Sequence, residues 1–168
     1  LRATDLLARS HGLDDATQLG IGLYVAYNLA ATLSSFPAGG LSDRIGPRGP
    51  LLVTAAGVIA FLLAYLLFAV TGPAIGLLAV AFVLAGVGIG CIETSEHAAV
   101  AAFAPAELRG SAFGLLATIQ AAGNLAASAI AGLLYTLASP AVAFAYLAIW
   151  MLAALLLITP IRTATHTS

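Results

Sequence analysis

Two glutamates and a histidine, Glu93, Glu96 and His97, are the residues whose types and spacing first suggest chemistry in this chain. Carboxylates and an imidazole one helical turn apart can transfer protons or bind a metal ion. Zinc peptidase helices of similar appearance carry two histidines around the glutamate, however, and here only His97 is present. The three residues share one helix end and show no convergent set at one depth, so the sequence predicts neither a metal centre nor a catalytic set.

The position of these carboxylates along their apolar segment favours a different role. Counted from Pro73 at about 1.5 Å per residue, Glu93 lies about 30 Å along a helix, which is the thickness of the hydrocarbon core of a bilayer. The two glutamates are therefore expected at the cytoplasmic boundary, in a gate or a surface charge network. Carboxylates that are simply solvated at a helix end are the alternative.

Uncharged polar side chains recur every four residues in two other apolar segments. Each set lies on one face of a helix, near the middle of the bilayer. The first set is Tyr24, Asn28 and Thr32, and the second is Gln120, Asn124 and Ser128. Because polar groups are costly against lipid, both stripes are expected to face protein or water, whereas the segments 51–70 and 141–159 carry no charge and no amide at mid-depth and are expected to face lipid. Two interpretations stay open: a polar cavity for a solute, or hydrogen bonds that hold helices together.

The segments that must position these residues are those of a membrane protein. Apolar residues make up 61% of the chain and charged residues 8%, and the mean hydropathy is +1.06. A soluble domain of this composition would have too little polar surface to cover its core. Five stretches are long enough to span a bilayer, so the predicted fold is an all-α integral membrane protein with five transmembrane helices. The expected spans are 19–38, 51–70, 73–92 continuing to about 100, 111–134 and 141–159.

The segments outside the spans set the expected domain boundaries and orientation. Residues 1–17 are too polar for a signal peptide and are expected to form an extracytoplasmic loop after a missing helix. Residues 18–160 then form the transmembrane domain, and 161–168 a cytoplasmic tail. Arginines mark the cytoplasmic side of a membrane protein. Arg44, Arg48, Arg109 and Arg162 fall on one side of the bilayer, against Arg2 and Arg9 on the other.

Small residues suggest close helix packing rather than a binding motif. Gly86 and Gly90 have the spacing that lets two membrane helices approach closely, and Gly110 and Gly114 repeat it. The G-x-G strings around Gly88 follow no strand, so a nucleotide fingerprint is not predicted. Cys91 is the single cysteine, which excludes a disulfide framework.

The stretch 39–48, G-G-L-S-D-R-I-G-P-R, places a charged tight turn between two apolar spans. It resembles the G-x-L-x-D-R-x-G-x-R cytoplasmic loop of the major facilitator superfamily, found between the second and third helices of each six-helix half. The matching residues are Gly39, Leu41, Asp43, Arg44, Gly46 and Arg48; Pro47 replaces a frequent arginine. The stretch 105–114, P-A-E-L-R-G-S-A-F-G, which contains Arg109, resembles the loop that opens the fifth helix of a half.

This resemblance implies helices eight to twelve of a twelve-helix secondary transporter, whose two halves rock around a central site. The expected cytoplasmic gate combines the loop motif with Glu93, Glu96 and Arg109, and the two polar stripes are the expected substrate cavity. The implied partners are a small solute, H⁺ or another coupling ion, the lipid bilayer and a missing N-terminal half, with no cofactor, metal or nucleic acid. The implied location is a bacterial inner membrane. A membrane-embedded enzyme or a non-transporting helical bundle is the alternative.

Overall fold

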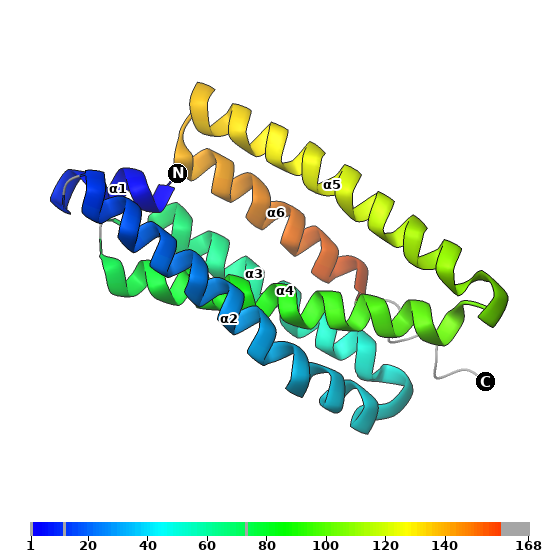
Figure 1. The fold of residues 1–168 in the computed structure, drawn as a ribbon. Helices are drawn as coiled ribbons and strands as arrows, with labels where there is room; N and C mark the ends of the chain where they lie inside the picture. Colours follow the sequence, from blue (N-terminus) through cyan, green and yellow to red (C-terminus); the bar gives the residue numbers. More distant parts are fainter. Residues whose placement is uncertain (1, 12, 73, 159–168) are drawn as a thin grey trace.

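The computed structural model describes residues 2–11, 13–72 and 74–158, and these fold into helices joined by short connections (Figure 1). No strand occurs among them. The α-helices are α1 (Arg2–His11), α2 (Leu13–Ile45), α3 (Gly49–Val70), α4 (Ile75–Phe103), α5 (Arg109–Leu137) and α6 (Pro140–Ile158); two 3-10 turns are η1 (Gly46–Arg48) and η2 (Ala106–Leu108).

The helix ends follow local sequence chemistry. Pro50 and Pro140 lie in the first turns of α3 and α6, where a missing backbone N–H breaks no helical hydrogen bond. The Ser139 hydroxyl accepts a hydrogen bond from the Val142 N–H at 3.2 Å and so caps the start of α6. Between α2 and α3 the chain reverses at Gly46, whose φ of 77° suits a residue without a Cβ.

The helices have the length and composition of membrane spans. Four apolar stretches qualify, and the first of them, Leu13–Val70, contains both α2 and α3, so five helices are long enough to cross a bilayer. The prediction of an all-α integral membrane protein is therefore confirmed. The span expected at 19–38 is longer in the structure, since α2 has 33 residues, whereas α4 at Ile75–Phe103 lies close to the expected span 73–92 with its continuation to about 100.

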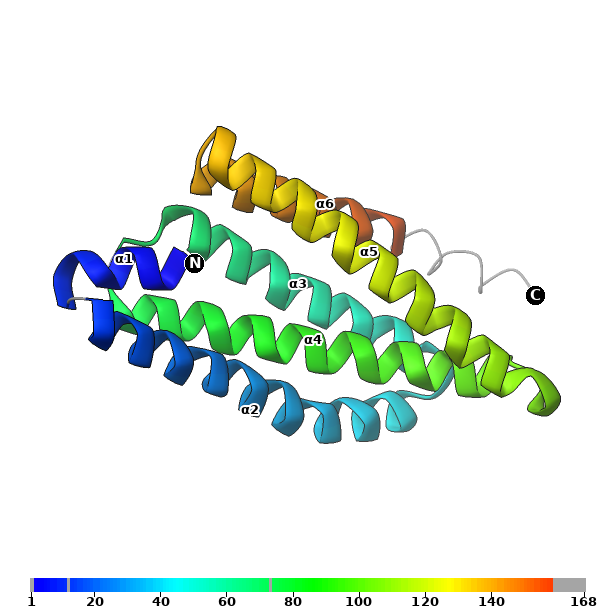
Figure 2. The same cartoon turned by 45° about the horizontal axis from the view of Figure 1, so that its top comes forward.

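Helix α4 lies at the centre of the bundle and packs against α2 on one side and α3 on the other (Figures 1 and 2). Helix α6 packs on α3. Helix α5 lies outermost: it contacts α6 and one end of α4, and none of its residues is buried. The bundle is thus tightly packed around α4 and open along α5.

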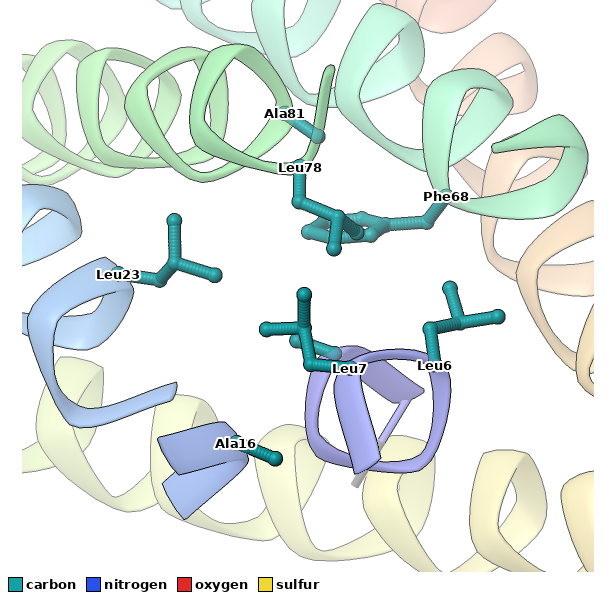
Figure 3. Close-up of a cluster of buried hydrophobic side chains, with 8 residues drawn as sticks. Leu6, Leu7, Ala16, Leu23, Phe68, Leu78 and Ala81 are labelled. Atoms are coloured by element: carbon teal, nitrogen blue, oxygen red, sulfur yellow. The ribbon is translucent and has the colours of Figure 1, made fainter. Parts of the chain in front are cut away.

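The first helix closes one end of the bundle. Leu7 of α1 is fully buried and lies among Leu23 of α2, Phe68 of α3 and Leu78 of α4 (Figure 3). Residues 1–17 were expected to form a loop, whereas the structure shows α1 and the first turn of α2 there. The physical reason is that Ala3, Leu6 and Leu7 form an apolar face at helical spacing, which the polar composition of the stretch obscures.

Two further expectations differ from the structure. The tight turn expected over 39–48 is confined to Gly46–Arg48, because α2 continues as a helix through Gly39 and Asp43 to Ile45. The span 51–70 was expected to face lipid. Instead α3 packs between α4 and α6, which buries its Val53, Ala60 and Phe68 and leaves only one face exposed.

Candidate functional site

The loop motif lies where α2 ends and α3 begins. Asp43 and Arg44 are exposed in the last turn of α2, where the positive charge of Arg44 suits the negative end of the helix dipole. Ser42 is buried, and a Cβ at Gly49 would collide with its carbonyl group, so Gly49 allows the two helix ends to meet. Arg48 is exposed at the start of α3.

The motif reaches α4 through Gly39. A Cβ at Gly39 would lie 3.5 Å from the Thr94 methyl group, next to Glu93. Among the described residues, no hydrogen bond or ion pair joins Asp43 to Glu93, to Glu96 or to α5. The structure therefore places the loop motif and the α4 glutamates on neighbouring helices without connecting their charges in this conformation, and the expected gate network stays a prediction.

The glutamates themselves lie inside α4. Glu96 precedes the last residue of the helix, Phe103, by seven positions, or about 10 Å, and Glu93 precedes it by ten positions, or about 15 Å. The span was expected to continue to about residue 100, and because no helix-breaking residue occurs before Pro105, the helix extends to Phe103. Both carboxylates lie well within the helix rather than at its end.

Glu96 makes a hydrogen bond across two helices. Its Oε2 accepts a hydrogen bond from Nε2 of Gln120 on α5, with the two atoms 2.6 Å apart. This contact joins a residue of the expected gate to a residue of the expected cavity, a link that the sequence analysis did not anticipate. The positions are 24 residues apart, and no spacing rule within one helix could have found it.

His97 makes contacts that hold its ring in place. Its Nδ1 lies 2.7 Å from the Glu93 carbonyl oxygen, and its ring stacks on Phe113 of α5 with the ring centroids 5.8 Å apart. The imidazole therefore packs at the joined ends of α4 and α5. Among the described residues, no three metal-ligating side chains lie together in a group that could hold a metal ion.

The polar stripe of α2 is exposed. Asn28 donates a hydrogen bond to the Tyr24 carbonyl at 2.8 Å, and Thr32 donates one to the Asn28 carbonyl at 3.0 Å. Tyr24 also stacks on Tyr27, with the ring centroids 6.0 Å apart. The Asn28 side-chain oxygen accepts no hydrogen bond from the described residues, so it is available to a ligand.

The polar stripe of α5 is also exposed, except at Gln120. Asn124 and Ser128 are exposed, whereas Gln120 is half-buried against Glu96. No hydrogen bond among the described residues joins this stripe to Tyr24, Asn28 or Thr32. The two stripes are therefore separate in this structure, with the Glu93–His97 stretch of α4 between their helices.

The two glycine pairs of the sequence, Gly86 with Gly90 and Gly110 with Gly114, have different surroundings in the structure. A Cβ at Gly86 would collide with the Tyr27 carbonyl, and one at Gly90 with Ser34 and the Ala31 carbonyl, so both glycines lie against α2. At Gly110 and Gly114 an added Cβ would meet nothing within 4 Å.

A third close approach was missed by the sequence analysis. On the other side of α4, a Cβ at Gly88 would lie 2.7 Å from the Phe61 ring and 3.0 Å from the Gly57 carbonyl of α3. The signal was available, because Gly88 alternates with Gly86 and Gly90 and so points to the opposite face of α4.

A shallow hollow of about 500 Å³ lies at the far end of the bundle, where α2 and α4 begin. Asp15, Gln18 and Gly22 line it together with apolar residues. The polar stripes and the α4 glutamates do not contribute to it, so it is not the site described above.

Comparison with known protein families identifies the family of this chain. The model of the Major Facilitator Superfamily matches residues 4–167. The chain belongs to the major facilitator superfamily. The match includes both loop stretches that suggested the family from sequence, around Asp43 and around Arg109.

Two relatives are similar to the chain over most of its length. A transporter of this superfamily from Methanocaldococcus jannaschii is 30% identical over 128 residues, which cover 75% of this chain and 30% of the relative. A gentisate transporter from Corynebacterium glutamicum is 36% identical over 110 residues, which cover 66% of this chain and 24% of the relative. The chain thus matches less than a third of each relative. No solved structure gives a significant match.

Proposed function

We propose that this chain is part of a longer secondary active transporter that moves a small solute across a membrane by alternating access. The observation that carries the proposal is the set of polar side chains on membrane-length helices: Glu96 bonded to Gln120, with Asn28 and Asn124 exposed. Polar groups at such positions are costly unless they face water, solute or protein. Family membership favours transport over catalysis.

The relation to longer relatives supports a position in the C-terminal half. The alignments cover only 30% and 24% of the two relatives, and the loop around Arg109 resembles the one commonest in C-terminal halves. The open side of α5 and the exposed stripe of α2 would then face the other half. Figure 1 shows α5 at the edge of the bundle, where a second six-helix unit would find it accessible.

The proposed solute cavity has the two polar stripes as its walls. Tyr24, Asn28 and Thr32 would contribute from α2, and Gln120, Asn124 and Ser128 from α5. Amides both donate and accept hydrogen bonds, so they can orient a polar solute without binding a proton themselves. If transport is coupled to H⁺, Glu93 and Glu96 are the titratable side chains nearest to these walls.

The proposed cytoplasmic gate lies at the end of the bundle where α2, α4 and α5 carry Asp43, Phe103 and Arg109. The chain alternates direction from α2 to α5, so Arg44, Arg48 and Arg109 all come to this end. Arginines gather on the cytoplasmic side of membrane proteins, which supports a cytoplasmic gate and C-terminus in a bacterial inner membrane.

Uptake into proteoliposomes tests the proposed transport. The full-length protein should accumulate at least one solute from a panel of small organic solutes when a solute or proton gradient is imposed. Gentisate is the first to test, because one relative is a gentisate transporter. Protein-free liposomes give the background. Binding of a solute without gradient-dependent uptake would contradict secondary transport.

A further inference from the structure

The face of α4 between α2 and α5 carries a carboxylate. On a helix, a step of three residues falls about 60° short of a full turn, so Gly90 and Glu96 lie to either side of Glu93. Gly90 lies against Ser34 of α2, and Glu96 accepts the hydrogen bond of Gln120 on α5. Helices α2 and α5 do not pack on each other. The exposed Glu93 side chain therefore points between the two helices that carry the polar stripes.

The side chains around Glu93 keep more free hydrogen-bond acceptors than donors. Asn28 donates from Nδ2 to a carbonyl group one turn earlier in α2, and the Thr32 hydroxyl donates to the Asn28 carbonyl. Gln120 donates from Nε2 to Oε2 of Glu96. Among the described residues, no hydrogen bond reaches the side-chain oxygens of Asn28 and Gln120, Oε1 of Glu96 or the Glu93 carboxylate. This arrangement suits a ligand that donates hydrogen bonds.

Permanent positive charges are absent from the same depth. The chain contains no lysine, and no arginine occurs at 10–43, 49–108 or 110–161, so its arginines lie at the helix ends. His97, one turn from Glu93, is positive only when its ring takes up a second proton. The chain therefore contributes carboxylates and free oxygens to this part of the proposed cavity, and no fixed cation.

We propose that the solute is an organic cation that carries a protonated amine. This inference rests on the proposed function and names its substrate class. Glu93 balances the charge of the amine, and the free oxygens of Gln120 and Glu96 accept hydrogen bonds from its N–H groups. A carboxylate within a membrane-length helix is unfavourable without a partner, and the bound cation supplies one. An anionic solute would instead meet a like charge where the dielectric constant is low and repulsion is strong.

Thiol reagents of opposite charge measure the sign of the potential at this face in the full-length protein. After Cys91→Ser, the variant Asn124→Cys is treated with trimethylammonioethyl or sulfonatoethyl methanethiosulfonate at about pH 8, where imidazoles are ordinarily neutral. Relative to free cysteine, the ratio of cationic to anionic rates should rise at least about tenfold, because unlike charges attract strongly where water is scarce. An unchanged or lower ratio would overturn the proposal, since cations from the rest of the protein would then neutralise Glu93.

A pair of matched substitutions locates the charge. Glu93→Gln should lower the ratio at Asn124→Cys by at least about threefold. Glu107→Gln makes the same chemical change at an exposed position in η2 and should leave the ratio as it is, because the start of α5 lies about 23 Å from Asn124 along the helix. Equal effects of the two substitutions, or no effect of Glu93→Gln, would overturn the assignment of the charge to Glu93.

A second position tests the same point with Glu93 left intact, in case Glu93→Gln does not fold. Leu137 is 77% exposed and lies thirteen positions, or about 20 Å, farther along α5 than Asn124. The ratio at Leu137→Cys should therefore be closer to that of free cysteine. Equal ratios at the two positions would overturn the proposal, because the potential would then belong to the protein surface in general.

Gradient-dependent uptake into proteoliposomes tests the solute class itself. The panel includes phenethylamine, phenylethanol and phenylacetate, which share one aromatic ring and differ in charge, together with the anion gentisate. Every solute that accumulates should carry an amine, and accumulation of gentisate or phenylacetate would overturn the proposal. A lack of reaction with both thiol reagents, or of uptake of any solute, would count against the proposed cavity and transport instead, because the rate ratio reports charge alone.

Discussion

At the scale of single residues, the two glycine pairs predict opposite responses to one added methyl group. Gly90→Ala places a Cβ against Ser34 and the Ala31 carbonyl, and such overpacking typically costs about 1–3 kcal/mol. Gly114→Ala meets nothing within 4 Å and should gain up to about 1 kcal/mol of helix propensity. Thermal unfolding in detergent should therefore show a lower midpoint for Gly90→Ala and an equal or higher one for Gly114→Ala. Equal midpoints would contradict close packing of α4 on α2.

The acid of the loop motif yields a prediction about transport instead of stability. In the proposed gate, Asp43 acts beside the positive N-terminal end of a helix when the cytoplasmic side is closed, an interaction of about 1–2 kcal/mol. Asp43→Asn should then slow uptake by roughly five- to thirtyfold, while the amount of protein in the membrane stays the same. Because Asp43 is exposed and forms no ion pair among the described residues, its loss should leave the unfolding midpoint unchanged. Unaltered uptake would remove Asp43 from the gate.

Residue patterns predicted which side chains are polar and aligned, but not which of them meet. A spacing of four residues places Gln120 and Asn124 on one face of a helix. It does not say how α5 is rotated toward its neighbours, and this rotation decides that Gln120 bonds Glu96 while Asn124 stays exposed. The depth of Glu93 was counted from Pro73, and because α4 continues to Phe103 this count alone does not decide how deep Glu93 and Glu96 lie in the bilayer.

At the scale of elements, α1 is predicted to stabilise the end of the bundle. Leu7 is fully buried among residues of three other helices, so Leu7→Ala should cost about 2–5 kcal/mol through lost contacts and a cavity. Leu13→Ala removes the same atoms from a side chain that is 74% exposed and serves as the matched control. Proteolysis of the reconstituted protein should show faster cleavage near α1 in Leu7→Ala only. Equal cleavage of both variants would mean that α1 is not docked in the membrane.

The sequence predicts where the helices are more readily than which side of each helix packs on its neighbours. Apolar runs of about 20 residues can span a bilayer only as helices or in closed barrels, so composition already decided the fold class. Helix α3, however, is apolar on all sides, so polarity does not distinguish its packed face from its exposed face. The small residues Gly57, Ala60 and Ala64 lie on the buried face and were the available signal. The prediction that this span faces lipid is therefore wrong for the buried Ala60 and stays a prediction for the exposed Leu63.

At the scale of the whole molecule, the exposed polar stripes of α2 and α5 require a neighbouring structure that keeps them away from lipid. Helix α5 has no buried residue, and the chain matches about 30% and 24% of its relatives. In the proposed transporter a second half covers the stripes of α2 and α5 and encloses water between the halves. The same side chains would otherwise face lipid, at a cost of several kcal/mol for each unpaired amide.

This contrast can be measured by the reactivity of single cysteines in the full-length protein. After Cys91→Ser, cysteines at Asn28, Gln120 and Asn124 should react with a membrane-impermeant thiol reagent, because water fills the proposed cavity.

The matched controls are cysteines at Ile59 of α3 and Ile149 of α6, which are exposed in the structure but are expected to contact lipid. They should not react, since a thiol in hydrocarbon neither ionises nor meets a polar reagent. Gentisate, if transported, should protect the first three positions from the reagent and leave the controls unchanged. Equal reactivity at all five positions would show that the stripes do not line a cavity. Hydrogen bonds between helices would then account for the amides of α2 and α5.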